Sequence, residues 1–318
     1  MAEWDKPRIL LVGGPTATGK TALAAALAKC LGGEIISADS MQVYQGLTIG
    51  TAKATPQEMQ GVPHHLIDCL PPTAPYSVAD FVLQAGRLIR EITARGRLPI
   101  LAGGTGLYLS SLMDGLRFSG QKPPEELRQR LRSQAMQEGA QAMYRRLCER
   151  DPEAAKGIHP NNLARVLRAL EACEADGLPL SRQKQLNRPE QPVYDPLLFC
   201  LTFADRQTLY ERIDARVDRM LTAGLLEEAQ KVYQHRLEYP TAVQAIGYKE
   251  FFGYFAGEQP LAECVQKLKQ ASRNYAKRQL TWFRHREGVV WLEAGDAALL
   301  DTALALIARR WPDLVPRP

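Results

Sequence analysis

The chain has 318 residues, of which 45% are hydrophobic and 24% are charged, and its formal net charge at pH 7 is +5. This length allows one large hydrophobic core or a domain that carries an insertion. No stretch reaches the roughly 20 apolar residues that span a bilayer. The N-terminus begins with acidic residues and has no small-residue cleavage site, so we expect no signal peptide. The six cysteines lie far apart without a C-x-x-C pair, which indicates neither a zinc site nor a disulfide framework and is typical of a reducing cytosol. We therefore expect a cytoplasmic protein.

The first part of the chain alternates short apolar runs with helical patterns. Residues 8–12, 34–38 and 98–102 predict buried parallel strands. Between them, the Ala- and Leu-rich segment 20–31 and the segment 78–94 predict helices. This order of strands and helices is typical of a doubly wound parallel sheet.

The pattern changes between about residues 119 and 195. This stretch is rich in arginine and lacks a strand pattern, and its prolines predict short helices that break at Asp151-Pro152, His159-Pro160 and Arg188-Pro189. Apolar strands return at 197–203 and 289–292 without a Gly/Ser-rich linker before them.

We therefore expect an α/β fold, a P-loop doubly wound parallel sheet with an inserted all-helical subdomain. The expected bounds are 1–118 for the first part of the core and 119–195 for the insertion. Residues 196–318 are expected to continue the core and to end in basic helices.

Residues 14–21, Gly-Pro-Thr-Ala-Thr-Gly-Lys-Thr, match the Walker A pattern between a predicted strand and a predicted helix. The glycines let successive backbone N–H groups point at phosphate oxygens, and the helix N-terminus adds a partial positive charge. Lys20 supplies a full positive charge, and the hydroxyl of Thr21 is a candidate ligand of Mg²⁺. We expect a site for a diphosphate or a nucleotide, formed by Gly14, Pro15, Thr16, Ala17, Thr18, Gly19, Lys20 and Thr21.

P-loop enzymes that act on a nucleoside triphosphate usually carry a second apolar strand that ends in a metal-binding Asp. Here the third predicted strand ends in Gly103-Gly104-Thr105-Gly106, and the carboxylate at a strand end near the phosphate crevice is Asp39. Asp39 is a candidate magnesium ligand through water or a general base, and a helix N-cap is an equally good interpretation. A small-molecule or nucleoside kinase is one hypothesis for such a site. An RNA-binding NTPase switch is another, against which the missing Asp argues.

Nine sequence blocks resemble those of the tRNA dimethylallyltransferases, the IPP transferase family, in its bacterial form. They occur in the family's order and span nearly the whole chain. The blocks are residues 14–21, Ile-Ser-Ala-Asp-Ser-Met-Gln-Val-Tyr (36–44), Ile-Gly-Thr-Ala-Lys (49–53), Pro-His-His-Leu-Ile-Asp (63–68), Gly-Gly-Thr-Gly-Leu-Tyr (103–108), Arg-Ala-Leu-Glu (168–171), Arg-Ile-Asp-Ala-Arg-Val-Asp-Arg-Met (212–220), Ala-Ile-Gly-Tyr-Lys-Glu (245–250) and Tyr-Ala-Lys-Arg-Gln-Leu-Thr-Trp-Phe-Arg (275–284).

The resemblance implies transfer of a dimethylallyl group from dimethylallyl diphosphate to tRNA, with release of diphosphate. The acceptor is the exocyclic amino nitrogen of the adenosine that is 3′-adjacent to the anticodon. A P-loop that holds a diphosphate leaving group needs Lys20 and Mg²⁺ but no residue that activates water, which agrees with the missing Asp. We expect tRNA, through its anticodon stem-loop, and dimethylallyl diphosphate as partners, no membrane, and a monomer.

The resemblance also implies roles for individual residues. Asp39 takes the role of general base. The hydroxyl of Thr105 is a candidate for a bond to the diphosphate or the acceptor nucleotide, although a helix cap is the alternative. Arg212 and Arg216 lie four residues apart on a helix face, interleaved with aspartates, so either an arginine that contacts the diphosphate or a surface helix with ion pairs is possible. The resemblance favours the first interpretation for at least one of them.

Contacts with tRNA are expected from three segments and from one helix face. The segments are Asp39, Ser40, Met41 and Gln42; Ala164, Arg165, Val166, Leu167 and Arg168; and Gln244, Ala245, Ile246, Gly247, Tyr248 and Lys249. The face carries Lys269, Arg273 and Lys277. The opposite side, with Val265, Leu268, Tyr275 and Trp282, is expected to pack in the core. Because no acidic residue lies between 264 and 286, we expect this stripe to contact tRNA phosphates rather than to be a solvated face. His64 and His65 lack further ligands at metal spacing, and we expect them either to be structural or to form hydrogen bonds to the site.

Overall fold

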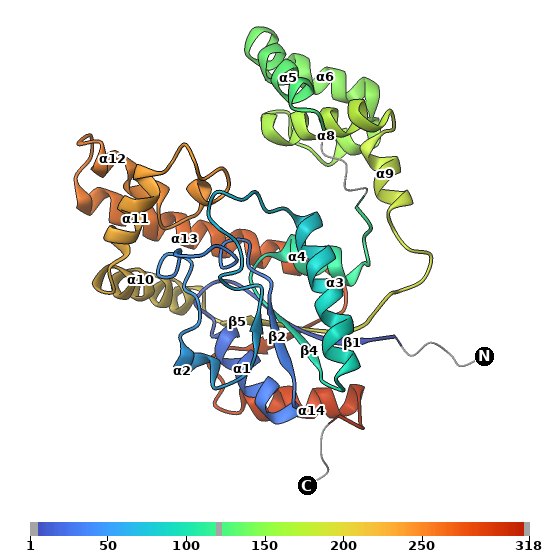
Figure 1. Ribbon diagram of the computed structural model, residues 1–318, viewed down its shortest axis with the longest axis vertical. Helices are drawn as coiled ribbons and strands as arrows, with labels where there is room; N and C mark the ends of the chain where they lie inside the picture. Colours follow the sequence, from blue (N-terminus) through green and yellow to red (C-terminus); the bar gives the residue numbers. More distant parts are fainter. Residues whose placement is uncertain (1–5, 119–122, 315–318) are drawn as a thin grey trace. The chain divides into compact units, whose positions relative to one another are not determined.

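The structure is a computed structural model that describes residues 6–118 and 123–314. The chain folds into two compact units (Figure 1). Residues 1–113 and 193–318 form the first, and residues 114–192 form the second. The second unit corresponds to the predicted insertion, but both of its bounds lie a few residues earlier than 119 and 195.

The first unit is built on a parallel sheet with the strand order β3-β2-β4-β1-β5-β6. The strands are β1 (Arg8–Gly13), β2 (Glu34–Ser37), β3 (His64–His65), β4 (Pro99–Ala102), β5 (Asp195–Thr202) and β6 (Val289–Glu293). Leu10 of the central strand lies opposite Ile100 on one side and Leu197 on the other. The predicted doubly wound sheet is confirmed. Strand β3 was not predicted, because two residues are too few to show a strand pattern.

Helices cover both faces of this sheet (Figure 1). Ile9 and Leu11 of β1 pack on the face covered by α3 (Val78–Ala94), α4 (Gly106–Met113) and α13 (Leu261–Arg284). Leu10 and Val12 face the opposite side, covered by α1 (Lys20–Leu31) and α14 (Leu299–Arg310). Side chains buried on both faces explain why the strands are continuous apolar runs in the sequence.

The remaining helices of the first unit lie mainly between β5 and β6 in the chain. They are α2 (Pro56–Met59), α10 (Arg206–Thr222), α11 (Leu225–Gln234), η1 (Ala242–Gln244), η2 (Lys249–Phe251) and α12 (Phe252–Phe255). Helix α10 packs against α13 through Leu209, Ile213 and Ala276. This contact places the charged helices α10 and α13 side by side, although about 40 residues separate them in the sequence.

Every regular element of the second unit is a helix within its described residues, 114–118 and 123–192. The helices are α5 (Glu125–Glu138), α6 (Ala140–Arg150), α7 (Pro152–Lys156), α8 (Leu163–Asp176) and α9 (Leu180–Leu186). They surround a small core of their own that includes Leu131, Leu147 and Leu170. The buried carboxylate of Asp151 caps α7 by accepting from the backbone N of Ala154 at 3.0 Å. The predicted all-helical composition and the predicted breaks at the prolines are confirmed.

In residues 6–118 and 123–314, none of the helices has the length and apolarity that a bilayer crossing requires.

Candidate active site

The Walker A segment Gly14–Thr21 forms the turn between β1 and α1. Gly14 and Gly19 have φ values of 130° and 85°, which favour glycine. A Cβ at Gly14 would lie 2.5 Å from the carbonyl oxygen of Leu201 in β5, so a larger residue does not fit. The hydroxyl of Thr18 and the ammonium of Lys20 both donate to the carbonyl of Pro15, at 2.9 and 2.6 Å. These bonds hold the loop curled and place the Lys20 ammonium at the start of α1.

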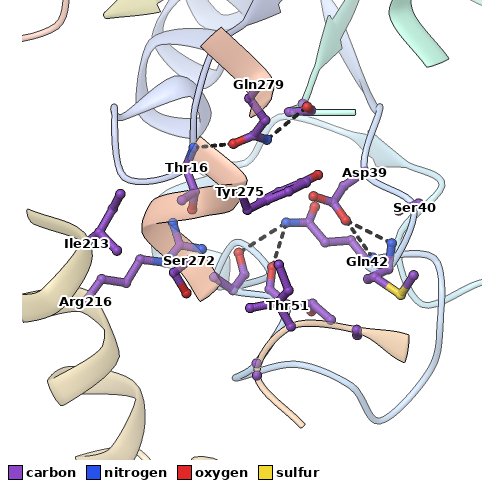
Figure 2. A pocket seen from close by; sticks show the side chains of 18 of the residues that line it. Thr16, Asp39, Ser40, Gln42, Thr51, Ile213, Arg216, Ser272, Tyr275 and Gln279 are labelled. Carbon is purple, nitrogen blue, oxygen red and sulfur yellow. Dashed lines mark hydrogen bonds between the residues drawn. The ribbon is translucent and has the colours of Figure 1, made fainter. Parts of the chain in front are cut away.

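A pocket of about 350 Å³ lies at the carboxyl ends of β2 and β4, beside this loop. Its walls come from the Walker A segment, the residues that follow β2 and β4, the loop 50–52, the segment 244–249, and one side each of α10 and α13 (Figure 2). The carboxyl edge of a parallel sheet is where doubly wound proteins bind their ligands. The pocket therefore lies where the sequence predicts a site.

Five charged side chains line this pocket: Lys20, Asp39, Arg216 of α10, Lys249, and Arg278 of α13. Figure 2 shows Arg216 extending from α10 into the cavity. Burial, and then the nearby Arg216, lower the pKa of Lys20 from 10.5 to about 8, although Asp39 acts in the opposite direction. Burial also lowers the pKa of Arg216, which Asp39 partly offsets. Lys20 and Arg216 are both half-buried, and an anion bound between them would favour the charged form of each, so this part of the pocket suits a diphosphate.

Asp39 follows β2 and uses one of its two carboxylate oxygens within the chain. Its Oδ1 accepts from the backbone N of Met41 at 2.9 Å and of Gln42 at 3.4 Å. Within the described residues no hydrogen bond engages its Oδ2. Oδ1 therefore caps a turn and not a helix, because no helix begins in the described residues between β2 and α2, so the helix N-cap interpretation is wrong. The second oxygen of this side chain, which lines the pocket, remains available to accept a proton or a metal-bound water.

Helix α13 contributes polar side chains to the site that the sequence analysis did not identify. Gln279 is 6% exposed, accepts from the backbone N of Thr16 at 3.0 Å and donates to the carbonyl of Gly104 at 2.9 Å (Figure 2). Tyr275, expected on the core face, lines the pocket and is hydrogen-bonded to Thr105 and Gln279. Burial, and then the charge of Asp39, raise the pKa of Tyr275 to about 12. The sequence does contain a signal for these two site residues, because a tyrosine and a glutamine lie four residues apart on the otherwise apolar side of the helix.

The Gly-Gly-Thr-Gly end of β4 is explained by close packing. A Cβ at Gly103 would lie 2.2 Å from the carbonyl oxygen of Ala38, and one at Gly104 would lie 2.0 Å from Nε2 of Gln279. At Gly106 the ring of Trp282 would be 2.4 Å away. Because Ala38, which follows β2, and side chains of α13 occupy this space, Gly103, Gly104 and Gly106 have no room for a larger residue.

Thr105 and Arg212 support the site without lining the pocket. The Thr105 hydroxyl accepts from the backbone N of Ser40 at 3.3 Å. Arg212 donates from Nε to the carbonyl of Ala17 at 3.1 Å, and its guanidinium lies 5.3 Å from the centre of the Phe203 ring. Of the two predicted arginines, Arg216 therefore reaches the cavity and Arg212 holds the Walker A loop.

Two of the three cations of the predicted stripe on α13 form ion pairs, although residues 264–286 contain no acidic residue. Arg273 forms an ion pair with Asp214 at 2.6 Å, and Lys269 forms one with Asp218 at 2.7 Å. Both aspartates belong to α10, so the acidic partners come from the neighbouring helix. Lys277 is exposed and lies 5.7 Å from the centre of the Tyr210 ring. Within the described residues it makes no ion pair.

The three segments predicted to contact tRNA lie in different surroundings. Ser40, Met41 and Gln42 line the pocket, as does the segment 244–249 except for Tyr248, which is fully buried. Residues 164–168 belong to α8 of the second unit. There Arg165 and Arg168 are exposed, whereas Val166 is buried in the core of the unit, so the two arginines are the better candidates for contact with a nucleic acid.

His64 and His65 form β3 at the edge of the sheet. His64 donates from Nδ1 to the carbonyl of Val62 at 2.8 Å, and Nε2 of His65 lies 2.7 Å from a carboxylate oxygen of Glu34. Neither histidine lines the pocket, so both have the structural role and not the expected alternative of hydrogen bonds to the site.

Thr21 and Asp39 both line the pocket and carry the hydroxyl and carboxylate oxygens that Mg²⁺ prefers. No cluster of three or more His, Cys, Asp or Glu side chains suited to a metal ion occurs in residues 6–118 and 123–314. These residues fit a magnesium ion that takes most of its ligands from water and from a bound diphosphate.

The fold and the pocket define an α/β enzyme that binds its ligand at the carboxyl edge of a doubly wound parallel sheet, next to a Walker A segment. The family described as IPP transferase matches residues 42–286, and the family described as isopentenyl transferase matches residues 7–69. The chain belongs to this family, the tRNA dimethylallyltransferases, as the sequence analysis predicted.

Named relatives and solved structures agree with this assignment. The tRNA dimethylallyltransferase of Geobacillus kaustophilus is 48% identical over 95% of this chain and 95% of its own. That of Bacillus subtilis is 48% identical over 92% of each chain. The crystal structure of the tRNA isopentenylpyrophosphate transferase of Bacillus halodurans has a TM-score of 0.71 at 43% identity and covers 98% of this chain and 97% of its own. A eukaryotic dimethylallyltransferase acting on tRNA has a TM-score of 0.81 at 29% identity, over 98% of this chain and 80% of its own.

Proposed function

We propose that this protein transfers a dimethylallyl group from dimethylallyl diphosphate to the exocyclic amino nitrogen of the adenosine 3′-adjacent to the anticodon in tRNA. One observation carries the proposal beyond family membership. The cations Lys20 and Arg216 share one pocket with the carboxylate of Asp39, and closely packed glycines stand at the end of β4 in place of the aspartate typical of enzymes that act on nucleoside triphosphates. Such a site suits a diphosphate as a leaving group.

These cations bind the donor in this proposal. The Walker A backbone, Lys20 and Arg216 hold the diphosphate and stabilise the negative charge that grows on it as the carbon–oxygen bond breaks. Magnesium, when bound beside Thr21, neutralises further charge on the diphosphate. Apolar side chains of the pocket, Ile213, Val217 and Leu268, surround the dimethylallyl group and exclude water from it.

Asp39 acts on the acceptor. The amino nitrogen of adenine is a poor nucleophile because its lone pair is delocalised into the ring, so both its position and its proton matter. As the new carbon–nitrogen bond forms, Oδ2 of Asp39 accepts the proton that the nitrogen loses. The acceptor base must leave its stack in the anticodon loop to enter the pocket. Ser40, Met41, Gln42 and the segment 244–249 line the pocket around that position.

We propose that three exposed cations contact tRNA phosphates: Arg165 and Arg168 of the second unit, and Lys277 of α13. We propose that the protein acts as a cytoplasmic monomer. Its net charge of +5 is small, so these particular side chains rather than overall charge account for tRNA binding.

The test uses unmodified tRNA, Mg²⁺ and either dimethylallyl diphosphate or ATP, with mass analysis of the adenosine product. We expect a dimethylallyl adduct with the first donor and no consumption of ATP. Asp39→Asn keeps an oxygen that can cap the turn but loses the base, so its rate should fall by roughly 10²- to 10⁴-fold while donor binding is retained. ATP consumption without an adduct would instead support a kinase and would contradict the proposal.

A further inference from the structure

Glu228, in the first turn of α11, accepts four hydrogen bonds through one carboxylate. Its Oε2 accepts from the backbone N of Thr48 at 2.8 Å and of Ile49 at 3.0 Å. Its Oε1 accepts from the backbone N of Gly50 at 2.9 Å and from the hydroxyl of Tyr248 at 2.8 Å. Three successive amides that converge on one anion resemble the backbone nests that bind phosphate. Here the anion is a side chain from a segment about 180 residues away along the chain.

The donors of these hydrogen bonds belong to two walls of the pocket. Gly50 lines one wall, and Tyr248 lies within the segment 244–249 that forms another. The ring of Tyr248 packs on Gly50 so closely that a Cβ there would lie 2.5 Å from it. Glu228 does not line the pocket itself, so it joins the two walls from behind.

The loop that Glu228 holds continues to Asp39 through Gln42. Nε2 of Gln42 donates to the carbonyls of Thr51 and Ala52, each at 3.2 Å. The backbone N of the same Gln42 donates to Oδ1 of Asp39 at 3.4 Å, and Figure 2 shows its side chain lying between Thr51 and Asp39. Hydrogen bonds at both ends of the loop 48–52, together with its backbone and Gln42, therefore connect α11 to the proposed base.

We propose that Glu228 is a positioning residue for the transfer reaction. It fixes the loop 48–52 and, through Gln42, keeps Asp39 directed at the acceptor nitrogen; this inference rests on the function proposed above. The groups that hold the diphosphate, Lys20 and Arg216, make no hydrogen bond to Glu228 or to this loop within the described residues. Loss of the carboxylate should therefore affect proton transfer and the acceptor, and leave donor binding intact.

Glu228→Gln tests this proposal with little change in shape. A glutamine offers one accepting oxygen and one NH₂ group, so at least one backbone N–H of the loop loses its acceptor. The matched control is Glu227→Gln, which makes the same charge change at an exposed neighbour. Tyr248→Phe is a second variant, which removes one of the four donors and keeps the ring packed on Gly50.

The measurements are kcat, the KM of each substrate and the thermal unfolding midpoint of the full chain. We expect kcat of Glu228→Gln to fall roughly ten- to a hundredfold, as misplacement of a reacting group by about 1 Å does. The KM of dimethylallyl diphosphate should stay within about twofold, Tyr248→Phe should show a smaller fall of kcat, and Glu227→Gln should match the wild type.

A wild-type kcat in Glu228→Gln, or a donor KM that rises as much as kcat falls, would overturn the positioning role. If Glu228→Gln does not fold, Tyr248→Phe decides, and an unchanged kcat in that variant overturns the proposal. Absence of transfer by the wild-type protein would show instead that the proposed function is wrong, and the inference would fall with it.

Discussion

The affinity of the Walker A loop for a diphosphate monoester should decrease as the pH rises through about 8. Burial, and then Arg216, lower the pKa of Lys20 to about 8 in the free protein, from an ordinary value of 10.5. A bound diphosphate favours the charged ammonium and raises this pKa again. Binding above pH 8 must therefore take up a proton, whereas below pH 8 the lysine is already charged and affinity is independent of its titration.

The size of this effect follows from the position of the pKa. With a pKa of about 8, roughly ten lysines in eleven are protonated at pH 7 but only about one in eleven at pH 9, so the apparent Kd should be about tenfold weaker at pH 9, or about 1.4 kcal/mol. A lysine with the ordinary pKa would leave the affinity unchanged over this range.

Isothermal titration of the protein with dimethylallyl diphosphate and Mg²⁺, without tRNA, measures this dependence. The last ionisation of a phosphate monoester lies near pH 6, so the charge of the donor is nearly constant above pH 7.5. Buffers with different ionisation enthalpies report the uptake of the proton. Lys20→Met should bind more weakly and without the decrease above pH 8. A flat wild-type profile between pH 7 and 9.5, or the same decrease in Lys20→Met, would refute the reasoning.

Two further predictions follow from the packing of β4 and from the paired stripe. Gly103→Ala places a Cβ 2.2 Å from a backbone oxygen, so denaturant unfolding should show a loss of about 1–3 kcal/mol. The Cβ of Gly104→Ala clashes with the end of the Gln279 side chain and is otherwise in ordinary contact with the carbonyl oxygen of Gly14, so this variant should lose less stability than Gly103→Ala. Because Gln279 also bonds the Walker A loop, Gly104→Ala should weaken donor binding, measured by titration. Equal stability losses in both variants would contradict this. Lys277→Ala should reduce the salt slope of tRNA binding by about one, whereas Arg273→Ala should change it less because Arg273 is paired with Asp214. Equal changes of the salt slope in Lys277→Ala and Arg273→Ala would contradict this and show that the Arg273–Asp214 ion pair opens when tRNA binds.

The sequence alone was sufficient to locate the elements with strong local patterns. The helix predicted at 78–94 has the bounds of α3, and the Walker A segment lies between β1 and α1 as expected. Both follow from signals within a few residues: helical periodicity with a capping serine at Ser77, and glycines at the positions where the backbone needs positive φ. Strand β3 carries no such signal, because it exists only through its pairing with β2.

The composition of the pocket depended on tertiary structure. Gln279 contacts Thr16 across 263 positions of the chain, and the acidic partners of Lys269 and Arg273 come from α10 rather than from their own helix. A helical projection places side chains on one face but does not show which element that face meets. The Walker A pattern, Asp39 and the family were therefore evident from the residues themselves. The roles of Tyr275, Gln279 and Glu228 emerged only when packing of the helices brought distant side chains within hydrogen-bond distance.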